Sequence, residues 1–252
     1  MGDLFNTVLY QPLFNLLIFF YNLIPDIGIS IILLTLVVKA ILWPLSHKGL
    51  KSQKALQDLQ PKMDALKEKH KGDKEKLGQE MMSLYKREKI NPLSSCLPLL
   101  IQLPVIIAVF RVFRVGLIDT NFDLLYSFVS NPGPLNPMML GIIDLAKPQI
   151  VLAVLAGVAQ FWHSMILMKK KKSTPAPKTG GGMAQTMSKQ MMYFMPIITV
   201  FIAASFPGGL ALYWLVMTLL NVLDQYIINK SIDENISQEP PKLAQPEIID
   251  SK

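Results

Sequence analysis

A single lysine lies inside an apolar stretch of the sequence, residues 28–46, which reads GISIILLTLVVKAILWPLS. A membrane helix needs about 20 apolar residues to cross roughly 30 Å of hydrocarbon, so this stretch can span a bilayer. Its only charged residue is Lys39. A charge inside a span is costly and marks a functional residue by default. Lys39 is therefore the first candidate for a site.

The ammonium of Lys39 can reach water in two ways. If the side chain snorkels, it must reach the interface near Ser46, about 10 Å away along the helix, while an extended lysine reaches roughly 6 Å. Thr35 and Ser46 share the helical face of Lys39. The distance favours a water-filled cavity, with snorkelling into thinned lipid as the alternative.

The composition is typical of a polytopic membrane protein. Of 252 residues, 51% are hydrophobic, and several apolar runs predict an all-α fold with membrane-spanning helices. The net charge of +7 would suggest nucleic acid, but the charges lie between the apolar runs, so we expect no direct nucleic-acid role. The single cysteine, Cys96, excludes an internal disulfide.

No pattern of catalytic residues is present. The sequence has no Gly-rich phosphate loop, no HExxH and no nucleophile elbow, and His163 has no second ligand at metal spacing. The sequence offers no acid to pair with Lys39 inside the membrane, with Asp224, near the inner end of the last apolar run, as the one candidate exception. We therefore expect no enzymatic activity, no cofactor and no metal.

The order of apolar and charged segments predicts five transmembrane helices, an N-terminal interfacial amphipathic helix and a cytosolic helical hairpin. The N-terminal segment is 1–27, in which residues 8–24 either lie on the membrane or form a sixth span. The predicted spans are 28–46, 92–115, 148–168, 190–207 and 208–229. Between and after them lie the hairpin 47–91, an extracytoplasmic loop 116–147, a basic cytosolic loop 169–189 and a disordered tail 230–252. The hairpin is either a charged linker or a docking or gating element.

The positions of the basic residues predict the orientation. Of the 25 Lys and Arg, twelve lie in the hairpin, six in the 169–189 loop and three in the tail. Because basic residues accumulate on the cytosolic side, the N-terminus should lie outside and the C-terminus in the cytosol. Arg111 and Arg114 are the exceptions.

Four of the spans carry polar side chains on one face. Such side chains must face the bundle interior or a wet cavity, so we expect them to form one site. Methionines near the inner ends of two spans either adapt to varied apolar partners or fill the core. The candidate groove residues are Lys39, Thr35, Ser94, Gln102, Gln160, Trp214, Thr218 and Asn221, and the candidate apolar contacts are Met165, Met168, Met191 and Met195.

Three motifs resemble the YidC/Oxa/Alb membrane protein insertases. They are NPLSSCLPLLIQLP at 91–104, FPGGLALYW at 206–214, and the first span leading into LQPKMDALKEKH. The resemblance implies a compact five-span insertase and chaperone in the bacterial cell membrane. Its cytosol-facing hydrophilic groove would admit the polar flank of a nascent membrane protein and release the apolar segment into the bilayer without nucleotide hydrolysis. Partners in that family include a Sec-type translocon and the ribosome, whose involvement here stays open.

The sequence departs from this family in three ways. Many relatives have Arg in place of Lys39. The ammonium of Lys39 cannot form the two parallel hydrogen bonds that a guanidinium makes with a carboxylate, so we expect it to bind a carboxylate more weakly. The tail is net acidic, which argues against ribosome docking through it. No large extracytoplasmic domain is present, which predicts the compact form or a shortened chain. The alternative functions are a small-anion transporter or channel that uses Lys39, or an assembly factor without insertase activity.

Overall fold

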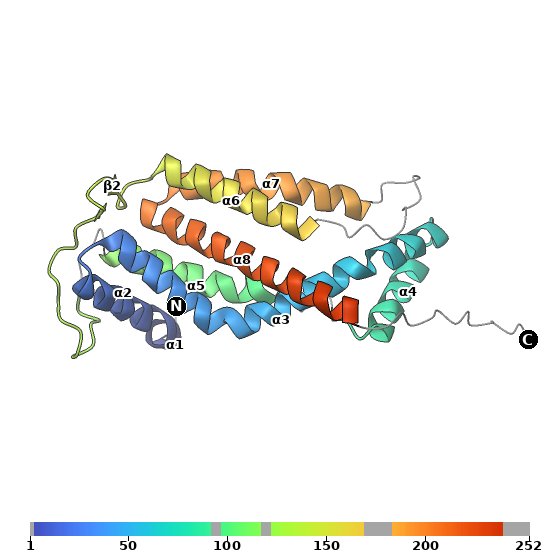
Figure 1. Cartoon of the computed structure of the whole chain (residues 1–252), viewed down its shortest axis with the longest axis horizontal. Helices are drawn as coiled ribbons and strands as arrows, with labels where there is room; N and C mark the ends of the chain where they lie inside the picture. Colours follow the sequence, from blue (N-terminus) through green and yellow to red (C-terminus); the bar gives the residue numbers. More distant parts are fainter. Residues whose placement is uncertain (1–2, 92–96, 117–121, 169–182, 239–252) are drawn as a thin grey trace, which may run out of the picture.

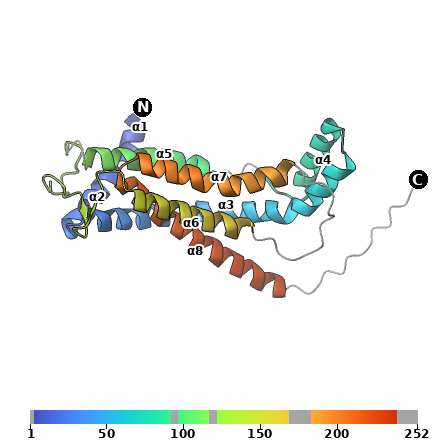
Figure 2. The same ribbon diagram turned by 90° about the horizontal axis from the view of Figure 1, so that it is seen from above.

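The molecule is an elongated helical bundle, seen here in a computed structural model that describes residues 3–91, 97–116, 122–168 and 183–238. Most of these residues are helical. The two views agree that α4 lies at one end of the bundle and the segment containing β2 at the opposite end (Figures 1 and 2). The long helices between them run along the long axis of the molecule.

The N-terminal segment is helical and packs into the protein. It consists of α1 (Asp3–Phe5), a π-helical turn (Asn6–Tyr10) and α2 (Gln11–Leu23). Phe14, Leu17 and Ile18 of α2 are fully buried, and their spacing places them on one helical face. That face belongs to the main hydrophobic core, and α2 contacts α3 and α5. The position of α2 relative to the membrane stays a prediction.

The longest element is α3, which runs from Ile27 to Lys69 without interruption. Its start is capped by Asp26, whose Oδ1 accepts a hydrogen bond from the backbone N–H of Ile29 at 2.9 Å. The helix passes through Pro44 and Pro61. The predicted boundary between residues 46 and 47 is therefore not a helix end. The chain becomes polar there, but it continues with Lys, Gln and Leu, which are good helix formers.

A second helix, α4 (Lys74–Arg87), contacts the last part of α3. Leu59 of α3 and Leu84 of α4 are both buried. Lys62 Nζ donates a hydrogen bond of 2.6 Å to Glu88 Oε1, just after α4. These contacts hold the two arms together. Their cytosolic location and their role stay predictions.

Three helices in the described part of the chain are long and apolar enough to cross a membrane. They are α3, residues Ile150–Leu167 of α6 and residues Gly208–Ile228 of α8. A shorter apolar stretch, Tyr193–Ser205, lies in α7. The count of five spans therefore stays a prediction. The bounds of the remaining helices are Leu97–Arg114 for α5, Ile150–Met168 for α6, Met183–Ser205 for α7 and Gly208–Gln238 for α8.

Two helices extend beyond their predicted spans. Helix α7 begins at Met183, inside the predicted loop 169–189, and α8 ends at Gln238, inside the predicted tail 230–252. The sequence between Gly209 and Glu239 contains no Gly or Pro that would stop α8, and the first proline after it is Pro240. Both helices therefore include polar sequence next to their apolar runs.

Helices α6 and α7 pack closely because small residues lie between them. Ala153 and Ala156 are fully buried, and a Cβ at Gly157 would collide with the side chain of Val200 in α7. Small residues let helix backbones approach in this way. Figure 1 shows the two helices side by side.

The segment between α5 and α6 was predicted as a loop, and its described part contains two short strands. Strands β1 (Met138–Met139) and β2 (Ile143–Asp144) pair antiparallel, with Met138 opposite Asp144. The backbone N–H of Asn136 donates to Tyr21 Oη at 3.0 Å, and that of Leu140 donates to Asp26 Oδ2 at 2.5 Å. The segment is thereby fixed to α2 and to the start of α3.

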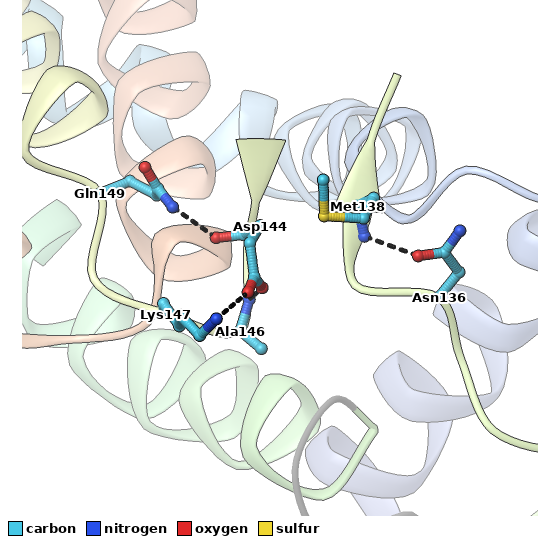
Figure 3. A network of polar contacts seen from close by, with 6 residues as sticks. All are labelled: Asn136, Met138, Asp144, Ala146, Lys147 and Gln149. Atoms are coloured by element: carbon cyan, nitrogen blue, oxygen red, sulfur yellow. Dashed lines mark hydrogen bonds and ion pairs between the residues drawn. The ribbon is translucent and has the colours of Figure 1, made fainter. Parts of the chain in front are cut away.

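Asp144 organises the turn that leads from β2 into α6 (Figure 3). Its Oδ1 accepts the backbone N–H of Ala146 at 3.0 Å, its Oδ2 lies 3.0 Å from Lys147 Nζ, and its carbonyl accepts Gln149 Nε2 at 2.6 Å. The hydrogen bond with Lys147 is the main reason that the pKa of Asp144 lies below its usual value.

We predict that this carboxylate makes stability depend on pH. Folding lowers the pKa of Asp144, so the ionised carboxylate adds to the free energy of unfolding. This contribution is fully present above the unfolded-state pKa of about 3.9 and is lost as the pH falls through the folded-state pKa. Asp144→Asn should therefore destabilise the protein at pH 7 by no more than about 1 kcal/mol, since the pair is partly exposed. Thermal unfolding of both proteins from pH 7 to 3 checks this. A difference that does not shrink in acid would contradict it.

Candidate functional site

Lys39 lies at the contact between α3 and α8 and is almost completely buried, with 6% of its surface exposed. Its Nζ donates a hydrogen bond of 2.6 Å to Asn221 Oδ1 and lies 2.5 Å from Asp224 Oδ2. Both partners belong to α8. The ammonium therefore does not stand alone, because α8 supplies an amide and a carboxylate to it.

The partners of Lys39 follow from the register of α8. Thr218, Asn221 and Asp224 are spaced by three residues and so lie close to one another on the helix. Thr218 and Asp224 are buried. Since a buried charge is tolerated only when it is paired and hydrogen-bonded, this face of α8 explains why a lysine is stable inside α3.

Asp224 is the main residue that the predicted site set omitted. The sequence indicated Asp224, near the inner end of the last predicted span, as a candidate partner of Lys39, but the predicted groove residues did not include it. Its position three residues after Asn221 is the signal that connects it with the site. The structure thus replaces an isolated cation with a buried ion pair.

Two other predicted residues make contacts of their own. Thr35 is fully buried, and its Oγ1 donates to the carbonyl of Ile31 one turn earlier at 2.6 Å. Gln102 of α5 donates through Nε2 to Tyr213 Oη of α8 at 3.0 Å. Tyr213 was not predicted, although it is adjacent to Trp214. This bond joins α5 to the helix that also holds Lys39.

The remaining predicted residues are spread over several helices. Gln160 and Trp214 are half-buried, in α6 and α8. Ser94 lies outside the described residues. Among the predicted apolar contacts, Met165 is 42% exposed and Met195 is half-buried, while Met168 and Met191 belong to α6 and α7.

His163 is a further polar side chain, in α6. Its Nε2 is buried and takes part in no hydrogen bond among the described residues. Within the described residues, no three His, Cys, Asp or Glu side chains gather in a way that could hold a metal.

Comparison with known proteins identifies the family. The family model described as "60Kd inner membrane protein" matches residues 19–235. The chain belongs to the 60Kd inner membrane protein family. This confirms the resemblance to the YidC-type insertases that the three sequence motifs indicated, and it agrees with the apolar helices of a membrane protein.

Individual relatives of this 60Kd family support the same assignment. The chain is 37% identical over 228 residues to the membrane protein insertase YidC of Geobacter sulfurreducens, covering 90% of this chain and 38% of the relative. It is 32% identical over 227 residues to that of Rickettsia rickettsii, covering 88% and 39%. The crystal structure of an active YidC insertase with its first transmembrane domain resolved superposes with a TM-score of 0.59 at 25% identity, covering 89% of this chain and 47% of that one. The chain thus spans about two fifths of the length of these curated relatives.

Proposed function

We propose that this chain is a membrane protein insertase that binds the polar flank of its substrate in a hydrophilic groove around Lys39. The observation that carries the proposal is the buried ammonium between α3 and α8, with Asn221 and Asp224 as its partners. The names of the relatives as insertases support the same activity.

The position of Lys39 suits this task. It lies twelve residues after Ile27, roughly 18 Å along α3 at 1.5 Å per residue, which is near the middle of a hydrocarbon core of about 30 Å. Polar groups at that depth lower the cost of bringing a polar tail into the membrane, because the tail finds hydrogen-bond partners there. Gln102 of α5 adds a polar side chain that is hydrogen-bonded to α8, the helix that pairs with Lys39.

The proposal includes a location and a set of partners. The chain would lie in the bacterial cell membrane with its N-terminus outside and its C-terminus in the cytosol, as the distribution of basic residues indicates. Its substrates would be nascent membrane proteins, which would leave the groove sideways into lipid without nucleotide hydrolysis. A transporter of small anions is less well supported, because the relatives that this chain resembles are named insertases.

Reconstitution tests the proposed activity. Proteoliposomes that contain this chain alone should insert a single-span substrate with an acidic N-terminal tail, so that the tail becomes protected from added protease. Vesicles without the protein are the control. A substrate whose tail stays accessible to the protease would overturn the insertase assignment.

Lys39 variants test the groove in the same assay. We expect Lys39→Ala to slow insertion of the acidic-tail substrate by about tenfold, equivalent to about 1.4 kcal/mol on the barrier. Lys39→Arg keeps the charge and adds a bidentate guanidinium, so it should insert this substrate at least as fast as the wild type. Equal rates for the alanine and arginine variants would show that the cation is dispensable.

A further inference from the structure

Asp224 is the feature of the site that the proposed function does not yet use. The Lys39 and Asp224 side chains are 8% and 10% exposed, and their charged atoms lie 2.5 Å apart. An incoming carboxylate would therefore meet an ammonium that already has an acidic partner. Two carboxylates beside one ammonium repel each other, and burial strengthens that repulsion.

The two partners of Lys39 differ in charge. An ammonium has three N–H donors, one of which is directed at Asn221 Oδ1. Asp224 is the charged partner, and its Oδ2 lies 2.5 Å from the ammonium in an ion pair. A substrate carboxylate is chemically the same kind of partner, so it can replace Asp224 while the hydrogen bond to the neutral Asn221 stays in place.

We propose that Asp224 is an internal competitor for the substrate's acidic tail. In the resting protein it occupies Lys39. A substrate carboxylate displaces it, and Asp224 pairs with Lys39 again when the tail leaves. The ammonium stays paired throughout, which avoids the large cost of an unpaired buried charge. The competition limits how tightly acidic tails bind, so that they are released rather than trapped. This inference rests on the proposed function, since it concerns the same site.

Two isosteric changes shift the competition in opposite directions. Asp224→Asn removes the competing charge, so acidic tails should bind more tightly relative to neutral ones. Asn221→Asp adds a second acid beside Lys39, so the preference for acidic tails should fall. Asp64→Asn is the matched control, because Asp64 forms an exposed ion pair with Lys67 far along α3, and it should change nothing.

The test uses the full chain in proteoliposomes, with a photoreactive residue at position 160 and two single-span substrates. One substrate has an acidic N-terminal tail, and in the other the acids are replaced by the corresponding amides. The readout is the ratio of the crosslinking yields of the acidic and amide tails. We expect this ratio to rise by about tenfold in Asp224→Asn, as for the loss of one partly buried like-charge contact, and to fall below the wild-type ratio in Asn221→Asp. Adding Lys39→Gln to Asp224→Asn should abolish the preference.

Each outcome decides between distinct alternatives. If the ratio of crosslinking yields is unchanged in Asp224→Asn, Asp224 is not a competitor. If that variant does not fold, an unchanged ratio in Asn221→Asp overturns the competitor role instead. Insertion of the amide-tail substrate by the wild type reports on the proposed insertase activity independently of the ion pair. If the wild type inserts this substrate while neither variant shifts the ratio, the inference about Asp224 fails and the insertase assignment stands.

Discussion

Replacing Lys39 by alanine is expected to lower the free energy of unfolding by about 3–5 kcal/mol. The change leaves the carboxylate of Asp224 buried at the α3–α8 contact without the cation that lies 2.5 Å from it. It also removes the donor to Asn221 Oδ1. Denaturant titration in detergent micelles, followed by tryptophan fluorescence and circular dichroism, measures the loss.

A double variant separates the lost pair from the loss of packing. Lys39→Met combined with Asp224→Leu removes both charges and keeps apolar volume, so it should recover most of the stability, because replacing a whole buried pair is often neutral or better. Lys62→Ala, which removes an exposed partner of Glu88, is the control and should unfold close to the wild type. If Lys39→Ala were as stable as this control, the buried pair would not exist in the membrane protein.

The second large effect is expected at Phe14. This ring is completely buried in α2 and stacks between Tyr10 and Phe122, each with a centroid distance of 6.0 Å. Phe14→Ala removes both ring contacts and leaves a cavity in the main core, which costs about 3–5 kcal/mol. The N-terminal helix should then be the first part of the protein to lose protection from hydrogen exchange.

Phe19→Ala provides a matched comparison within the same helix. Phe19 is 43% exposed, so its truncation creates no enclosed cavity and should cost far less than truncation of Phe14. Equal losses for the two variants would show that α2 does not pack against the core through the face that contains Phe14.

Part of the site could be predicted from the sequence because some of its residues belong to patterns within a single apolar run. A charge in an apolar run identified Lys39, and the polar spacing along the last span identified Thr218 and Asn221. The partnership itself joins residues 182 positions apart, and only tertiary packing sets the rotation of α8 that brings Asn221 to Lys39. Tyr213 was missed for the same reason, since its bond to Gln102 depends on how α5 and α8 pack.

The fold was predictable in type but not in its helix ends. Apolar runs indicated an all-helical membrane protein, and the predicted boundaries followed the changes in hydrophobicity. Helix formation depends on backbone hydrogen bonds and on residue propensity as well, so α3 and α8 continue into polar sequence until Lys69 and Gln238. Strands of two residues, as in β1 and β2, are too short to leave an alternating pattern.

The proline at position 44 gives the long α3 helix a mechanical property. A proline has no N–H to donate to the carbonyl four residues earlier, which here belongs to Ala40, directly after Lys39. The bending stiffness of α3 should therefore be low at this joint, as it should be at Pro61, and the arm from Pro44 to Lys69 is about 37 Å long at 1.5 Å per residue. A sideways force on α4 would therefore bend α3 at Pro44. The part of α3 before this proline would move less, so the ion pair between Lys39 and Asp224 would stay intact.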